Sequence, residues 1–196
     1  MARAGLSGER LARAGAELAD EVGFEQVTVS ALARRFGVQV ASLYSHVRNS
    51  DDLKTRIATV ALTELADQAA AAVAGRAGQD ALTALADVYR TYAQSHPGRY
   101  AASRYTPPDA QATTTDFVAA GKRHSELMRA VLRGYDLDEP AQTDAVRLLG
   151  SFFHGYVTLE LSGSFSHSGP PSADSWPRIL HAVDTLLRTW PERQSS

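Results

Sequence analysis

The sequence has no cysteine, and this absence excludes several kinds of chemistry. Without thiols the chain forms no disulfide bond, supplies no thiolate nucleophile and holds no cysteine-ligated zinc. Long apolar runs are also missing, because no stretch approaches the ~18 consecutive apolar residues that a membrane-spanning helix needs. The opening stretch MARAGLSGER lacks the apolar segment of an export signal. We therefore expect a cytoplasmic protein with no membrane partner.

Enzyme motifs are missing as well. The sequence contains no GxSxG, no GxGxxG, no P-loop and no pair of carboxylates at a suggestive spacing. Its six histidines are scattered and form no HExxH or comparable metal-binding pattern. We therefore expect a protein that is not an enzyme, with no catalytic residues, no metal site and no cofactor.

Net positive charge is lacking too. The 20 basic and 22 acidic residues give a formal net charge of −2, whereas proteins that coat nucleic acid non-specifically are strongly basic. Residues 1–56 carry 8 basic and 7 acidic residues, a net of +1, which leaves 12 and 15, a net of −3, for the remainder. This contrast is small, so charge gives only slight support to a DNA-binding N-terminal part.

Apolar residues recur at helical spacing along most of the chain, and alternating runs of strand length are missing. The pattern predicts an all-α fold, with loops at the polar segments Asp109–Thr115 and Gly163–Asp174. The expected helices are Leu6–Val22, one capped by Thr28 and ended by Gly37, Val40–His46, Asp51–Ala74 with Ser50 as its cap, Asp80–Ser95, a short piece within Arg99–Tyr105, Asp116–Tyr135, Pro140–Leu161 and Trp176–Trp190.

The stretch from Thr28 to Leu53 has the spacing of a helix-turn-helix. Its apolar positions are Leu32, Ala33 and Phe36 before the turn, and Val38, Leu43 and Val47 after it. Gly37 lies where the turn needs a permissive backbone. The side chains between the apolar positions are short or form hydrogen bonds, as contacts to base edges and phosphates require: Gln39, Val40, Ala41, Ser42, Tyr44, Ser45 and His46.

Two alternatives stay open for this stretch. Arg34 and Arg35 are either phosphate contacts or part of a solvated helix face, as runs of charged residues usually are. Tyr44 either contacts DNA or packs its ring on the neighbouring core, and His46 either contacts DNA or caps a helix end.

These residues resemble a known family. The combination of Thr28, Leu32, Ala33, Gly37-Val38, Ser42-Leu43-Tyr44, His46-Val47, Asn49 and Leu53 is similar to the helix-turn-helix of TetR-type transcriptional regulators. The segment LLGSFFHGYVTLELSGSF resembles the regulatory domain of one TetR subgroup. The resemblance implies a three-helix DNA-binding domain at 1–50 and a helical-bundle regulatory domain at 51–196. Within the latter, 51–74 is the connecting helix, and the helices at about 141–190 form the dimer.

The resemblance also implies a function. It indicates a homodimer that binds a palindromic operator in double-stranded DNA and responds to a small-molecule effector, most simply as a repressor that the effector releases. The alternative is a helical protein that binds or sequesters a small molecule and has a non-functional DNA-binding head. Whether it represses or activates depends on where the operator lies.

By position, the resemblance assigns base reading to Gln39, Val40, Ala41 and Ser42. It assigns contacts with the phosphate backbone of DNA to Thr28, Tyr44 and His46. The predicted DNA-binding residues also include Ser30 and Arg48. The apolar Val40 and Ala41 favour contact with thymine methyl groups. Ser50 stands where the family carries a phosphate-binding lysine, and Arg48 and Lys54 are the candidate replacements.

The regulatory part is rich in aromatic residues, which predicts an apolar or aromatic effector. The predicted ligand-binding residues are Tyr89, Tyr92, Tyr100, Tyr105, Phe117, Met128 and Phe153. The alternative is that these are ordinary core residues. Val146–Leu161 and the last helix are more apolar than a monomer surface requires, which favours a dimer over a thickly packed monomer.

Overall fold

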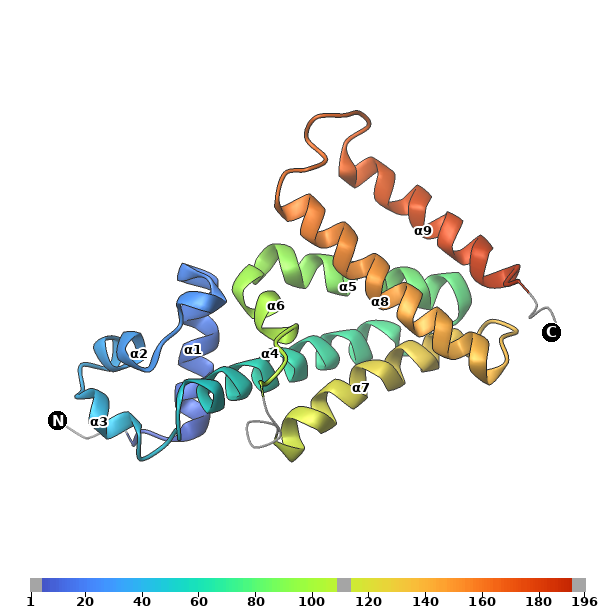
Figure 1. The fold of residues 1–196 in the computed structure, drawn as a ribbon. Helices are drawn as coiled ribbons and strands as arrows, with labels where there is room; N and C mark the ends of the chain where they lie inside the picture. Colours follow the sequence, from blue (N-terminus) through green and yellow to red (C-terminus); the bar gives the residue numbers. More distant parts are fainter. Residues whose placement is uncertain (1–4, 109–113, 192–196) are drawn as a thin grey trace. The chain divides into compact units, whose positions relative to one another are not determined.

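Helices account for the regular structure of the described residues, 5–108 and 114–191, in the computed structural model of the chain (Figure 1). The predicted all-α class is therefore confirmed. Residues 109–113 of the predicted loop Asp109–Thr115 lie outside the described part, as do residues 1–4 and 192–196. Across the described ranges, no helix has both the length and the apolar character that a membrane crossing requires.

The helices occur close to the predicted positions. In chain order they are α1 (Gly8–Val22), the short 3-10 helix η1 (Phe24–Gln26), α2 (Val29–Phe36), α3 (Val40–Leu43), α4 (Ser50–Val73), α5 (Gly78–Ser95), α6 (Pro97–Ser103), α7 (Thr115–Leu132), α8 (Glu139–Leu161) and α9 (Ser172–Arg188). The periodicity therefore located the helices well and their ends less well, as expected where caps and packing decide the last turn.

Side-chain caps fix the starts of α2 and α4. Thr28 accepts the Ala31 N–H at 3.1 Å, as its position predicts. The prediction that Ser50 caps α4 is wrong, because the Asn49 side-chain oxygen accepts the Asp52 N–H at 2.8 Å. Asparagine satisfies the same unpaired N–H groups of the first turn, so the cap lies one residue earlier and α4 begins at Ser50 itself.

The last helix begins earlier than predicted. α9 starts at Ser172, whereas the sequence pattern placed the start at Trp176. The Trp176 side chain is buried, and its ring centroid lies 4.7 Å from that of Tyr156. Its indole N–H donates to Asp87 at 2.7 Å. These contacts stabilise helical turns on both sides of Pro177, a residue that is otherwise expected only in a first turn.

The chain divides into two compact units, and α4 and α7 each contribute to both. The first unit contains the described residues up to Ala66 together with Ser95–Arg123, and the second contains Asp67–Gln94 and the described residues from His124 onward. The compact units thus group α6 with the N-terminal helices. The functional division into 1–50 and 51–196 stays a prediction.

Within the first unit, α6 packs directly on α1. A Cβ at Gly98 would lie 1.9 Å from the Ala19 carbonyl oxygen, so the two backbones approach too closely for any other residue. Asp20 accepts the Arg99 backbone N–H at 2.8 Å and contacts His96 Nδ1 at 3.1 Å. A carboxylate of α1 therefore holds the first turn of α6 in addition to the close backbone contact.

Within the second unit, an ion pair ties α5 to α8. Arg90 donates to both carboxylate oxygens of Glu160, at 2.8 and 2.6 Å, and its guanidinium lies 5.4 Å from the Trp176 ring centroid. Only 18% of the Arg90 side chain and 11% of the Glu160 side chain remain exposed. The Arg90 guanidinium lowers the pKa of Glu160, and burial opposes this effect only in part.

We expect Glu160→Gln to lower the free energy of unfolding by about 3 kcal/mol at pH 7, because it leaves a mostly buried guanidinium without its counter-ion. Because the pKa of Glu160 is lowered in the folded state, its ionised carboxylate stabilises the fold at pH values above the ordinary pKa of 4.5. This stabilisation is lost as the pH falls below 4.5 and through the lowered pKa of the folded state. The difference in melting temperature between the variant and the native protein should therefore narrow from pH 7 to pH 3.5.

A suitable control is Asp144→Asn, which breaks the exposed pair between Asp144 and Arg147. Exposed pairs contribute about 0–1 kcal/mol, so this variant should melt within a few degrees of the native protein. Equal effects of the two substitutions at pH 7 would contradict the structural role given to the Arg90–Glu160 pair.

Candidate nucleic-acid interface

The helix-turn-helix rests on a core in the first unit. Leu32 and Leu43 are fully buried, and Ala33 and Val47 are 1% and 2% exposed, as the apolar spacing predicts. These side chains pack with residues of α1 and α4, among them Leu11, Ala16, Leu53 and Ile57. The backbone on either side of the turn is therefore fixed by burial, which leaves the intervening side chains for a partner.

Gly37 makes the turn between α2 and α3. Its φ of 64° lies in the left-handed region, which glycine adopts without steric cost. Its N–H donates to the Arg34 carbonyl at 3.2 Å, and the Val38 N–H donates to the Ala33 carbonyl at 3.0 Å. These bonds satisfy the Ala33 and Arg34 carbonyls in the last turn of α2, and the chain continues into α3 beside α2 (Figure 1).

The predicted helix Val40–His46 is shorter in the structure. Regular helix covers Val40–Leu43, and a turn follows up to His46. The Leu43 carbonyl accepts both the His46 N–H at 2.9 Å and the Val47 N–H at 3.1 Å. This tightening brings Val47 into the core, so packing overrides the helical periodicity at this end.

The nine predicted DNA-binding residues are all exposed or half-buried. Tyr44 is 53% exposed, so about half of its surface is accessible to a partner, and the choice between a DNA contact and packing on the core stays open. His46 and Val40 are half-buried, and the exposed members of the set are Thr28, Ser30, Gln39, Ala41, Ser42, Tyr44 and Arg48. The structure therefore presents these side chains at the surface, while their assignment to bases or phosphates stays a prediction.

The cations near the turn differ in their contacts. Arg35 donates to Glu21 at 2.7 and 2.8 Å and pairs with Glu17 at 3.3 Å, so it ties α2 to α1. Lys54 pairs with Glu25 at 2.6 Å, and its ammonium lies 5.2 Å from the Phe24 ring centroid. Both cations are thus used within the first unit, whereas Arg34 on the same helix as Arg35 is exposed.

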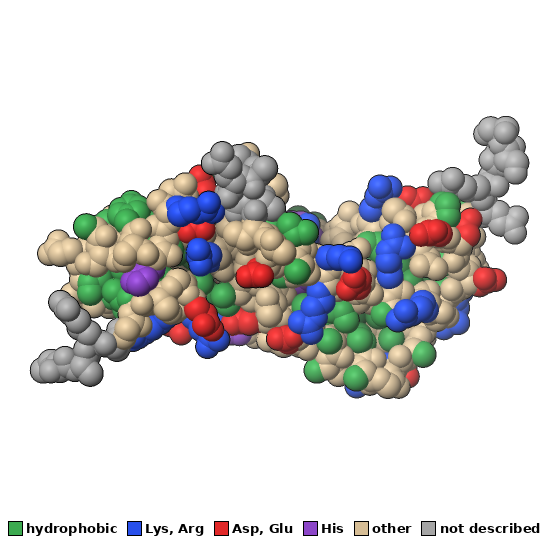
Figure 2. All heavy atoms as spheres, turned by 90° about the horizontal axis from the view of Figure 1, so that it is seen from below, with side chains coloured by type: hydrophobic (Ala, Val, Ile, Leu, Met, Phe, Trp, Pro, Cys, Tyr) green, Lys and Arg blue, Asp and Glu red, His purple; other side chains and the backbone are tan. Residues whose placement is uncertain are grey.

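The two candidate replacements for a cation at Ser50 differ in their exposure. The Lys54 side chain is only 16% exposed and is engaged by Glu25. The Arg48 side chain is 61% exposed. On the face shown in Figure 2, basic and acidic side chains of the described residues are interspersed.

The predicted ligand-binding residues are distributed over both units. In the second unit, the Tyr89 hydroxyl lies 2.7 Å from His124 Nδ1, and its ring centroid lies 5.4 Å from that of Phe153. Tyr92 and Met128 are buried in the same unit. Residues from α5, α7 and α8 therefore come together there.

The other three members lie in the first unit. Tyr105 packs edge-on against Phe24, with ring centroids 5.6 Å apart, and its hydroxyl donates to Asp51 at 3.3 Å. Tyr105 thus packs against the helix-turn-helix core as a half-buried side chain. Tyr100 is buried, which raises its pKa to about 12, and Phe117 is half-buried. Tyr89 and Phe153 are therefore neighbours in the second unit, whereas Tyr105 belongs to the first unit.

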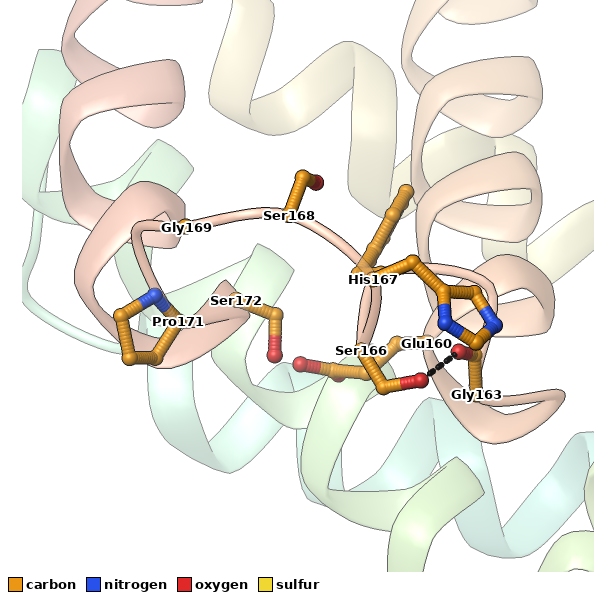
Figure 3. A pocket seen from close by; sticks show the side chains of 9 residues that line it. Glu160, Gly163, Ser166, His167, Ser168, Gly169, Pro171 and Ser172 are labelled. Atoms are coloured by element: carbon orange, nitrogen blue, oxygen red, sulfur yellow. Dashed lines mark hydrogen bonds between the residues drawn. The ribbon is translucent and has the colours of Figure 1, made fainter.

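A hollow of about 530 Å³ lies where the segment between α8 and α9 folds back (Figure 3). Its described walls are Glu160, Gly163, Phe165, Ser166, His167, Ser168, Gly169, Pro171 and Ser172. The Ser166 hydroxyl donates to the Gly163 carbonyl at 2.6 Å, which shapes this segment. Sequence reasoning treated the segment only as a loop, because its composition carries no signal for a concave surface.

Two parts of the chain match known protein families. Residues 11–54 match the bacterial regulatory proteins of the tetR family, and residues 82–183 match the tetracyclin repressor-like C-terminal domain. The second match alone covers more than half of the chain. The chain belongs to the TetR family. The family consists of transcriptional regulators that bind DNA and effector ligands and function as dimers.

Individual relatives agree with this assignment. The chain is 32% identical to the uncharacterized HTH-type transcriptional regulator Rv0681 of Mycobacterium tuberculosis over 158 residues, which cover 81% of this chain and 72% of the relative. It is 31% identical to the uncharacterized HTH-type transcriptional regulator YobS of Bacillus subtilis over 188 residues, 96% of this chain and 92% of the relative. The structure of a protein with unknown function from Rhodococcus sp. RHA1 shares the fold, with a TM-score of 0.77, 21% identity, and coverage of 95% of this chain and 98% of that one.

Proposed function

We propose that this TetR-family chain is a sequence-specific DNA-binding regulator that acts as a homodimer on a palindromic operator. The observation that carries the proposal is that Gln39, Ala41, Ser42 and Tyr44 are exposed on a backbone that buried Leu43 and Val47 hold in place. One short helix reads too few base pairs for specificity, whereas a twofold dimer presents two such helices to two half-sites.

Features of α8 and α9 support dimerisation through these helices. Leu159 and Leu161 on α8 are 47% and 45% exposed, and Leu186 on α9 is 42% exposed. Apolar side chains of this size are stabilised when a second copy covers them. All three leucines lie within the range of about 141–190 that is predicted to form the dimer.

We further propose that the protein is a cytoplasmic repressor and that a small apolar or aromatic molecule releases it from DNA. Tyr89, His124 and Phe153 form a buried aromatic cluster in which the Tyr89 hydroxyl lies 2.7 Å from His124 Nδ1. A planar ligand that opens this cluster would meet aromatic rings, a hydroxyl and an imidazole, which are groups that orient such a ligand. α4 runs without interruption from the Asn49 cap into the second unit. A ligand that favours one orientation of α4 lowers DNA affinity by its difference in affinity between the two states.

The test uses a DNA duplex selected by the purified protein from a random-sequence library. We expect the selected sequences to share a palindrome and footprinting to protect two patches about one or more helical turns apart. Planar aromatic compounds that raise the melting temperature are then added to the complex, and at least one is expected to weaken binding tenfold or more. Compounds that stabilise a protein with no DNA preference would instead support a sequestering protein with a non-functional head.

A further inference from the structure

Asp52 connects the end of the helix-turn-helix to the start of α4, and its side chain is only 1% exposed. One carboxylate oxygen accepts the Arg48 backbone N–H at 2.9 Å and the Arg56 Nε–H at 3.1 Å. The other accepts from the Arg48 guanidinium at 3.4 Å. The Asp52 backbone N–H in turn donates to the Asn49 side chain. One buried carboxylate thus holds both the backbone and the side chain of Arg48.

The charge of Asp52 has the wrong sign for direct contact with DNA, because phosphate repels a carboxylate. Burial alone would raise its pKa, but the hydrogen bonds from the Arg48 N–H and the Arg56 guanidinium outweigh burial and lower it. Asp52 is therefore ionised at neutral pH. Its effect on DNA binding must pass through the groups that it holds.

Arg48 differs from the other cations around this connection. Lys54 is engaged by Glu25 and is mostly buried. Arg56 is 40% exposed, but a Cβ at Gly8 would lie 2.8 Å from its guanidinium, so it packs closely against α1. The Arg48 side chain is 61% exposed although Asp52 holds one of its nitrogens. An exposed guanidinium is accessible to a phosphate, which it binds through charge-assisted hydrogen bonds.

We propose that Asp52 is a positioning residue for DNA binding, which fixes Arg48 in the orientation that contacts the DNA backbone. This inference rests on the proposed function. A side chain that is already ordered loses less conformational entropy when it binds, and the gain occurs twice in a twofold dimer. Asp52 therefore strengthens binding even though its own charge opposes it.

The test is a double-mutant cycle on the duplex selected by the native protein. Asp52→Asn keeps an oxygen that accepts the Arg48 N–H but removes the charge that attracts the guanidinium. We expect it to weaken operator binding about fivefold or more in the native background. In the Arg48→Ala background the same change should alter affinity less than about twofold, or strengthen binding, because only phosphate repulsion remains to be relieved.

Arg56→Ala serves as the matched background, since Arg56 also donates to Asp52. There Asp52→Asn should still weaken binding about fivefold, because Arg48 is intact. An equal loss in the native and Arg48→Ala backgrounds would show a merely structural role and overturn the inference. Unchanged or tighter binding by Asp52→Asn in the native background would overturn it as well.

A measurement without DNA separates this inference from the proposed function. The Arg48 amide should be protected from hydrogen exchange in the native protein. This protection should be partly retained in Asp52→Asn and lost in Asp52→Ala. Exchange that is equally fast in all three proteins would refute the positioning role whatever the DNA result. Absence of any preference of the native protein for the selected duplex over a scrambled one would instead refute the proposed function.

Discussion

The double variant Ser42→Ala/Tyr44→Ala is expected to lose at least ~100-fold in affinity for the operator, because base and backbone contacts each contribute about 1–3 kcal/mol and a dimer loses them in both half-sites. Its stability should hardly change. Both side chains are exposed, and substitutions of this kind usually stay within about 0.5 kcal/mol. Fluorescence anisotropy on the selected duplex measures the affinity, and thermal unfolding measures the stability.

Val118→Ala is the matched control for this variant. Val118 is 54% exposed, close to the 53% of Tyr44, but it lies on α7 outside the helix-turn-helix. We expect it to bind the operator as the native protein does. Unchanged affinity of the double variant would remove Ser42 and Tyr44 from the DNA interface, while equal losses in both proteins would point to a general loss of structure.

Gly98→Ala is expected to lower both stability and operator affinity, because the new Cβ would lie 1.9 Å from a backbone oxygen of α1. α6 must then move away from α1, and overpacking of this kind costs about 1–3 kcal/mol. The melting temperature should fall by roughly 2–10 °C. Because α1 packs on the helix-turn-helix core, part of this strain should disturb the DNA-binding surface. If it raises the free energy of the DNA-bound state by ~1.4 kcal/mol relative to the unbound state, operator affinity falls about tenfold.

Gly121→Ala controls for the loss of glycine itself. Gly121 lies within α7, and a Cβ there would meet nothing within 4 Å. Alanine in place of a helical glycine should stabilise the protein by about 0.5–1 kcal/mol and leave operator affinity unchanged. If Gly98→Ala also stabilised the protein, the close contact between α1 and α6 would have to be abandoned.

The apolar periodicity was sufficient to predict the helices and the core of the helix-turn-helix. Leu32 and Leu43 are buried where their spacing requires, because a helix has one apolar face to cover. The turn at Gly37 was predictable for a similar local reason, since its positive φ favours glycine. These features depend on neighbours in the sequence, which a pattern can represent.

Contacts between distant segments could not be predicted in this way. The packing of Gly98 on Ala19, far apart in the sequence, has no local signature. In the sequence, Asp52 is one of two adjacent acidic residues at a helix start, and only its burial and its contacts with Arg48 distinguish it. Tyr105 was grouped with the ligand-binding aromatics by composition, but packing places it on Phe24.

The most direct test of the account is the affinity of the native protein for the selected duplex and for a scrambled duplex of the same composition, measured over a range of salt concentrations. We expect two chains per duplex and a preference for the selected sequence of about 10³-fold or more at physiological salt, with affinity for both duplexes falling as salt rises. Equal affinity for the two duplexes at every salt concentration would contradict a sequence-specific regulator.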